Sequence, residues 1–309
     1  MEQQLVIVRI EESKDEDDVT RTRTRQIVPL SQLKPGAEIA VSEHRRIQII
    51  ELNDEELRFT LNDTKHYVLN RYWQVLGTVK FDLPSDWLDE SERFTFHFET
   101  PVEKAEPGVY ERISELADAM LEQNGKGNYW KNIPLARETM HLFKDCCPVR
   151  DEELNPAVRI AGVEFMASEK MLPKNDVPRL FLSLYEYWEI CHDLWEEQDG
   201  EIDTSEENTD WLNRNIFKYT WTIDSGMTSD LYERMFGKET FARFDFNQLS
   251  LEWEKAVYDI EKETEEEVGE EYLFDGFCFE IWDAKTRIAG RRGISWRSPH
   301  VMNPDAMWD

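Results

Sequence analysis

The spacing of the apolar residues changes near residue 105, and this change limits the folds that the chain can adopt. Before it, short stretches of β-forming residues are separated by turn signals every 8–12 residues or so. One stretch carries Phe94, Phe96 and Phe98 on a single strand face. After it, apolar residues recur every three or four positions, the period of an amphipathic helix. We therefore predict an α+β protein with a β-rich domain over 1–105 and a helical domain over 106–309, joined at a boundary that no linker marks.

The N-terminal domain is expected to form a small barrel or sandwich, because its strands are short and closely spaced. An acidic patch over 15–18 is expected at a loop or hairpin tip, and Pro35-Gly36 signals a turn. The predicted strands cover 5–10, 20–25, 46–52, 57–61, 74–82 and 94–98.

The rest of the chain is predicted to be a central helical region followed by a helix and a β-hairpin. The clearest helix carries Phe181, Leu184, Tyr185 and Trp188 on one stripe. Helices are expected over 106–125, 133–146, 157–171, 178–196, 230–237 and 248–268. The segment 211–222 suits a helix or a strand. Residues 272–283 are expected to form a strand, with 285–296 as its hairpin partner.

Charge narrows the classes of function. The chain has 65 acidic and 36 basic residues, for a net charge of −29. Such a charge repels nucleic acid and anionic membranes, and it favours basic partners, cations or plain solubility. The N-terminus lacks the basic start of a signal peptide, and the apolar runs are too short to span a membrane. We expect a cytoplasmic protein, with Cys146, Cys147, Cys191 and Cys278 as free thiols.

The negative charge is segregated along the chain. Residues 180–213 contain no Lys or Arg, whereas bases gather towards both ends, at 21–25, 45–46 and 285–297. We expect the acids of this window to form a partner-binding face. Its members are Glu186, Glu189, Asp193, Glu196, Glu197, Asp199, Glu201, Asp203, Glu206 and Glu207.

Within that window, residues 195–206 resemble the calcium-binding loop of an EF-hand. Gly200 takes the sixth, turn-forming position, and Ile202 takes the apolar eighth position. The resemblance implies calcium ligands at the third, fifth, ninth and twelfth positions, which are Glu197, Asp199, Asp203 and Glu206. Trp195 departs from the pattern, because it stands at the first position and has no oxygen ligand to offer. A plain acidic loop is the competing interpretation.

Two other sets of residues have the composition of metal sites. Glu138–His141 and Glu189–His192 are Glu-x-x-His steps of the kind that di-iron helix bundles use, and Glu115 and Glu164 fall in the matching order. However, Glu138 and His141 lie away from the apolar stripe of their helix, so a surface pair is favoured there.

Asp275 and Asp283 flank the predicted C-terminal strand. They are the least arbitrary carboxylate pair for a metal-dependent hydrolase.

No catalytic signature stands out, so a non-enzymatic interaction protein is the leading hypothesis. It would be an acidic inhibitor, immunity protein or anti-defence protein that binds a basic protein, for example a nucleic-acid-binding enzyme, with no direct contact to nucleic acid or membrane. A metal-dependent hydrolase and a calcium-binding module are the alternatives. No cofactor is expected apart from calcium in the acidic loop, and a homo-oligomer remains open.

Overall fold

A computed structural model describes residues 2–15, 18–79, 90–148, 151–168, 170–196, 245–269 and 278–304. The chain divides into two compact units. Unit 1 comprises Met1–Glu122, Pro134–Met171 and Arg179–Thr204, and unit 2 comprises Gln123–Ile133, Leu172–Pro178 and Ser205–Asp309. This grouping differs from the boundary expected near residue 105, which lies inside unit 1. The predicted α+β class is confirmed, with two antiparallel sheets in the N-terminal half and helices after them.

The strands of unit 1 form two four-stranded antiparallel sheets. The first, sheet A, has the order β2-β1-β8-β7, and the second, sheet B, has the order β3-β4-β5-β6. Neither sheet closes into a barrel within the described residues. Sheet A contains β1 (Gln4–Asp15), β2 (Asp18–Pro29), β7 (Val75–Val79) and β8 (Glu90–Glu99). Sheet B contains β3 (Glu38–Ala40), β4 (Arg46–Leu52), β5 (Glu56–Leu61) and β6 (Lys65–Asn70).

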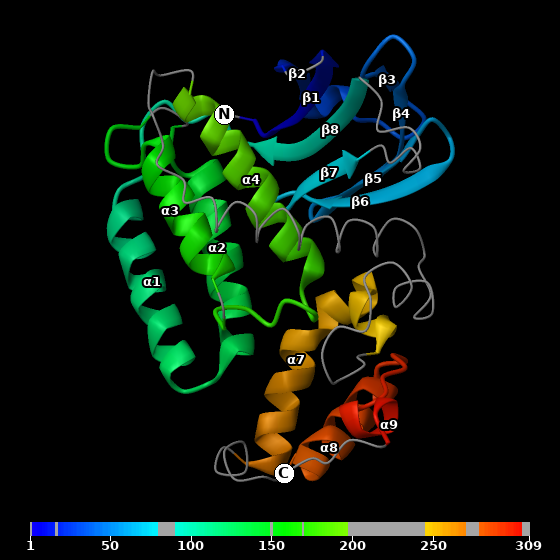
Figure 1. Cartoon of the computed structure of the whole chain (residues 1–309), viewed down its shortest axis with the longest axis vertical. Helices are drawn as coiled ribbons and strands as arrows, with labels where there is room; N and C mark the ends of the chain where they lie inside the picture. Colours follow the sequence, from blue (N-terminus) through cyan, green and yellow to red (C-terminus); the bar gives the residue numbers. More distant parts are fainter. Residues whose placement is uncertain are drawn as a thin grey trace. The chain divides into compact units, whose positions relative to one another are not determined.

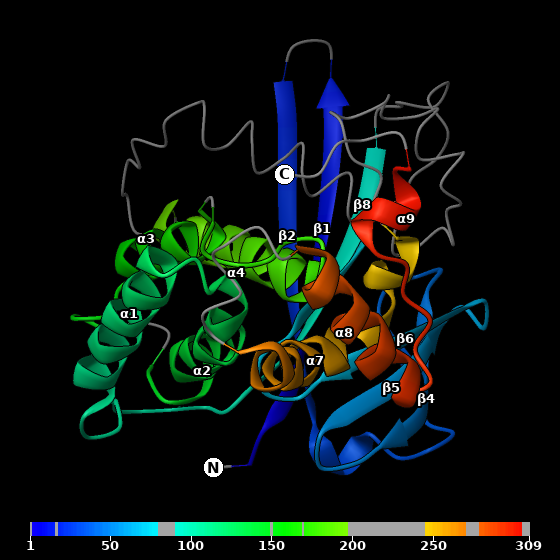
Figure 2. The ribbon, with the colours of Figure 1, turned by 90° about the horizontal axis from the view of Figure 1, so that it is seen from below.

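The two faces of sheet A serve different cores. Phe94, Phe96 and Phe98 join Phe59 of sheet B in one buried cluster, as the alternation along β8 predicts. The opposite face carries a separate buried cluster of Val6, Val8 and Ile10. Figures 1 and 2 show sheet B on one side of sheet A and helices on the other. These helices are α1 (Val109–Gly125), α2 (Asn132–Asp145), α3 (Pro156–Ala167) and α4 (Pro178–Glu196).

Local sequence explains the ends and buried faces of these helices. Asn155 caps α3 by accepting a hydrogen bond from the backbone N–H of Val158, and Pro156 takes the first helical position, where no N–H is needed. On α4, the predicted stripe is buried; Phe181 and Leu184 have no exposed surface. Ser183 of α4 donates a hydrogen bond from Oγ to the carbonyl oxygen of Val75 in sheet A over 2.9 Å.

Unit 2 is helical where the structure describes it. It contains η3 (Tyr129–Lys131), η4 (Phe246–Leu249), α7 (Leu251–Val268), α8 (Cys278–Arg291) and α9 (Pro299–Met302). The predicted hairpin of 272–283 with 285–296 is wrong, because α8 occupies most of that stretch. Its buried residues are Ala284, Lys285, Ile288 and Ala289. They form two pairs four positions apart, which is the spacing of one face of a helix.

The sequence reading also missed two strands, β3 and β6. The predicted elements at 211–222 and 230–237, the strand residues 272–277 and the calcium-type loop from residue 197 onward all lie outside the described residues. Among the helices that are described, none is long and apolar enough to cross a membrane.

Candidate functional site

A cavity of about 410 Å³ lies within unit 1, between the helix-facing side of sheet A and helices α2, α3 and α4. Its walls combine apolar side chains with charged ones. The apolar part comes from Val8, Phe143, Tyr187, Ile190, Cys191 and Leu194, and the polar part from Arg23, Arg25, His97, Glu99, Lys144, Arg159 and Asp193. Its volume is in the range typical of small-molecule sites, roughly 300–1,000 Å³.

Strand register places the polar residues of sheet A on one face. In the antiparallel pairing, Val8 of β1 lies opposite Arg25 of β2, and Val6 lies opposite His97 of β8. Paired residues share a face, and so do residues two apart on a strand. Arg23 and Arg25 of β2 and the Thr95-His97-Glu99 series of β8 therefore share the face that carries Val6, Val8 and Ile10, which is the face towards the helices.

Four basic side chains line the cavity, and they differ in exposure. The side chain of Arg25 is 47% exposed and pairs with Glu99, whereas that of Arg23 is 20% exposed and pairs with Asp193. Lys144 and Arg159 are buried. Arg25 therefore lies at the solvent side of the cavity, with Lys144 and Arg159 at its inner side.

The two inner bases are held by uncharged acceptors. Lys144 donates from Nζ to the carbonyl oxygens of Gln74 at 3.0 Å and Tyr72 at 3.2 Å. Arg159 donates to the carbonyl oxygen of Leu154 at 2.7 Å and to the hydroxyl of Tyr187 at 2.9 Å. These acceptors are uncharged, and the nearby carboxylates of Asp145 and Glu99 attract the Lys144 ammonium. Burial lowers the pKa of Lys144 to about 8, so the amine is still mainly protonated at pH 7.

His97 contributes a buried polar atom that faces no acceptor or donor. The residue is 5% exposed, and its Nδ1 has no hydrogen-bond partner among the residues that the structure describes. Its Nε2 lies 3.6 Å from Oε2 of Glu99. Burial lowers the pKa of His97, so the imidazole is neutral at pH 7.

Glu99 is the carboxylate that organises this end of the cavity. Burial alone would raise its pKa, but contacts with His97, Arg25 and Gln4 outweigh burial and lower it to about 2. Glu99 is therefore ionised at neutral pH. With it and Asp193 opposing four bases, the lining carries two more positive than negative charges. The cavity is thus electropositive in a chain whose net charge is −29.

The structure places only part of the predicted acidic face. Glu186 and Glu189 are buried, and Asp193 faces Arg23 across the cavity. Glu189 pairs with Arg93 of β8. Glu196 ends α4, and the other predicted members (Glu197, Asp199, Glu201, Asp203, Glu206 and Glu207) lie outside the described residues. The three placed carboxylates therefore meet groups of unit 1 instead of forming one open surface.

The bases near the two chain ends have partners too. In unit 1, Arg23 and Arg25 pair with Asp193 and Glu99. In unit 2, α8 contacts α7; Arg287 of α8 pairs with Glu267, and Arg292, directly after α8, pairs with Glu263. The segregation of charge along the sequence is thus partly cancelled by ion pairing inside each unit.

The glutamates considered as di-iron ligands form hydrogen bonds with other side chains of unit 1. Glu138 receives two hydrogen bonds from Arg112, at 2.7 and 3.1 Å, whereas His141 contacts Asp145. Glu164 accepts from the indole N–H of Trp188 at 3.2 Å. Across the described part of the chain, no group of three or more His, Cys, Asp or Glu side chains is placed to hold a metal ion. Asp283 is exposed on α8, and Asp275 lies outside that part.

The sequence predicts the strand over 20–25 that carries Arg23 and Arg25, but it does not predict the cavity that they line. The buried Lys144 and Arg159 gave no signal, since a base in an amphipathic helix is ordinarily solvent-facing. Comparisons with protein families, curated proteins and solved structures find no match to this chain.

Proposed function

We propose that unit 1 binds a small amphipathic anion in the cavity between sheet A and helices α2–α4. One observation carries the proposal: the lining has four bases against two carboxylates, although acids dominate the chain as a whole. Keeping Lys144 and Arg159 charged and buried opposes folding unless opposite charge compensates them. Asp145 and Glu99 supply part of that charge at Lys144, and an anionic ligand adds to it.

The lining also defines the chemical class of the ligand. A carboxylate, sulfonate or phosphate accepts charge-assisted hydrogen bonds from guanidinium groups, which are about twice as strong as neutral ones. Phe143, Ile190 and Leu194 provide an apolar wall for the rest of the molecule. The free Nδ1 of His97 is placed to exchange one further hydrogen bond. We therefore expect a ligand with one acidic group on an apolar body.

A matched pair of fluorescent probes tests this. Anilinonaphthalene sulfonate is an aromatic anion, and N-phenyl-1-naphthylamine is the same body without the sulfonate. We expect the sulfonate to bind at least about tenfold more tightly, which corresponds to about 1.4 kcal/mol. Arg25→Gln should weaken the sulfonate and leave the neutral probe unaffected. Arg58→Gln is the control, because Arg58 is equally exposed at 47% but lies on β5, outside the lining. Equal binding of both probes, or no effect of Arg25→Gln, contradicts the proposal.

As a second proposal, this acidic chain binds a basic protein partner. The net charge of −29 and the absence of Lys and Arg from residues 180–213 support it. In it the chain acts without catalysis as an inhibitor or immunity protein for a basic protein. Recovery of such a partner from the native host should fall steeply between low and high salt, because salt screens exposed charges. Neutralising Glu201, Asp203 and Glu207 to the amides should reduce it as well. A partner held equally at high salt would refute this proposal.

Calcium binding by the acidic loop stays a prediction, as does hydrolysis at scattered carboxylates. Calorimetric titration with calcium, comparing the natural chain with Glu206→Gln, tests the loop, since the twelfth position supplies the bidentate ligand of an EF-hand. No heat of binding in either protein would count against it.

A further inference from the structure

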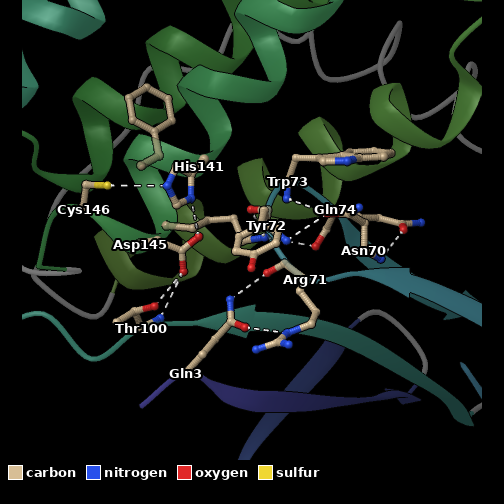
Figure 3. Close-up of polar contacts among 12 residues, drawn as sticks. Gln3, Asn70, Arg71, Tyr72, Trp73, Gln74, Thr100, His141, Asp145 and Cys146 are labelled. Atoms are coloured by element: carbon tan, nitrogen blue, oxygen red, sulfur yellow. Dashed lines mark hydrogen bonds and ion pairs between the residues drawn. The ribbon is translucent and has the colours of Figure 1, made fainter. Parts of the chain in front are cut away.

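A second group of reactive side chains lies at the C-terminal end of α2, outside the lining of the cavity. His141 and Asp145 are four residues apart on the helix, and Cys146 follows directly after its last residue. Figure 3 shows the imidazole of His141 between the thiol of Cys146 and the carboxylate of Asp145, with Thr100 beyond the carboxylate. The group thus contains a thiol nucleophile, an imidazole that can exchange a proton with it, and a carboxylate that orients the imidazole.

The contacts run in one line from the chain after β8 to the thiol. Thr100 donates to Oδ1 of Asp145 from its backbone N–H at 3.1 Å and from Oγ1 at 3.3 Å. Oδ2 of Asp145 lies 2.9 Å from Nδ1 of His141. Nε2 of His141 lies 3.9 Å from Sγ of Cys146. Because Asp145 engages Nδ1, the other ring nitrogen is the one that faces the sulfur.

Electrostatics favours an imidazolium beside this sulfur. The hydrogen bonds with Asp145 and Cys146 raise the pKa of His141 to about 10, so the ring is protonated at neutral pH. A neighbouring histidinium stabilises a thiolate. Burial raises the pKa of Cys147 to about 11 and that of Cys191 to about 12, although the nearby Arg159 guanidinium acts in the opposite direction on both thiols.

Access restricts the reaction partner. Cys146 is only 6% exposed, but the side chain of His141 next to it is 40% exposed. A bulky electrophile does not fit beside a thiol that is nearly covered, whereas a peroxide of the size of hydrogen peroxide needs little room. We propose that Cys146 is a site of oxidation by small peroxides, activated by His141 and Asp145.

The oxidation needs only the peroxide, the thiolate of Cys146 and the imidazolium of His141. The thiolate of Cys146 attacks one peroxide oxygen, the O–O bond breaks, and a sulfenic acid forms at Sγ. The displaced oxygen takes the imidazolium proton of His141 and leaves as water. Sulfur loses two electrons and the peroxide gains them. Thr100 and Asp145 act as positioning residues, because they hold the imidazole towards the sulfur.

The experiment follows sulfenic acid at each cysteine of the full-length protein. Hydrogen peroxide is added for timed intervals, sulfenic acid is trapped with dimedone, and fragmentation mass spectrometry separates Cys146 from Cys147. We expect trapping at Cys146 at least tenfold faster than at Cys147 or Cys191. His141→Gln should remove most of this advantage, while His66→Gln, which changes an exposed histidine on β6, should leave it intact.

Two results would overturn the proposal: equal rates at Cys146, Cys147 and Cys191, or a Cys146 rate that His141→Gln does not change. Asp145→Asn gives an independent check. It retains an acceptor for the contacts of Thr100 but weakens the hold on the imidazolium, so the rate should fall between those of the natural chain and His141→Gln. Circular dichroism of each variant establishes that a slow rate does not come from unfolding.

Discussion

Arg93 of β8 and Glu189 of α4 form an ion pair in which both side chains are largely buried. Tyr185 adds a hydrogen bond from its hydroxyl to Oε1 of Glu189 at 3.2 Å. Both charges have left water, so each depends on the other for compensation. The pair joins the sheet to the helix that carries much of the cavity wall.

Glu189→Ala is therefore expected to lower the free energy of unfolding by about 3–5 kcal/mol, because it leaves Arg93 buried without its main counter-charge. Urea denaturation followed by circular dichroism measures this. Glu115→Ala is the matched control: Glu115 pairs with Arg112, but its side chain is 66% exposed, so its loss should cost less than about 1 kcal/mol. Equal losses would show that the Arg93–Glu189 pair is not a buried contact.

Gly162 of α3 lies against the ring of Phe143, and a Cβ at this position would meet Cζ of Phe143 at 2.8 Å. Gly162→Ala should destabilise the protein by about 1–3 kcal/mol, because the ring must leave its packed position. Gly290→Ala is the comparison. It is also helical, but nothing lies within 4 Å, so alanine should stabilise by up to about 1 kcal/mol through helix propensity. Thermal melts of both variants measure these changes. Two shifts of the same sign would contradict the packing of α3 on α2.

Gly162→Ala should also affect ligand binding, since Phe143 lines the cavity. A displaced ring narrows or reshapes the apolar wall. We expect weaker binding of both naphthalene probes, charged and neutral alike, whereas Arg25→Gln should affect the charged probe alone. Titrations of the two variants side by side separate the loss of shape from the loss of charge.

The elements that the sequence predicted well are those with a regular apolar pattern. The helix expected at 178–196 has those bounds in α4, and that expected at 248–268 covers α7. The C-terminal hairpin was wrong because the aromatic residues before Asp283 suit a strand and a helix equally, and only the burial of Ala284 and Ile288 on one face distinguishes them. Strand β6 was missed because its polar residues, among them His66, hide its alternation.

The candidate site could not be predicted from the sequence, for a different reason. Its charged residues come from β2, β8, α2, α3 and α4, which are far apart along the chain. Strand register and helix packing bring them together, and neither is encoded in a local motif. The acidic window was read as a surface, but the partners of Glu189 and Asp193 are arginines in distant strands.

The pH dependence of stability gives a test of Glu99. Its folded-state pKa is about 2, below its ordinary value of 4.5, so its ionisation stabilises the fold. That contribution is fully present above about pH 4.5 and is lost as the pH falls towards 2. Glu99→Gln removes the charge at every pH. The difference in stability between the natural chain and Glu99→Gln should therefore be largest near neutral pH and shrink below pH 4.5. Denaturation at pH 7 and at pH 3 measures it, and a difference that is the same at both would contradict the ionised Glu99.

In unit 2, Asp176 ties η4 and α7 to the chain before α4. Its Oδ1 accepts hydrogen bonds from the indole N–H of Trp253 at 2.8 Å and from Nε2 of Gln248 at 2.7 Å. Trp253 is fully buried and stacks on Trp296, with ring centroids 5.7 Å apart. Asp176→Ala leaves the buried indole N–H without this acceptor, which should cost about 1–3 kcal/mol.

Asp176→Asn is the matched control, because an amide oxygen still accepts both hydrogen bonds while the charge is lost. We expect it to cost clearly less than Asp176→Ala. Urea denaturation followed by circular dichroism measures both losses. If Asn and Ala were equally harmful, the charge of Asp176 acting on the nearby Lys285 ammonium, and not the hydrogen bonds, would be the main contribution to stability.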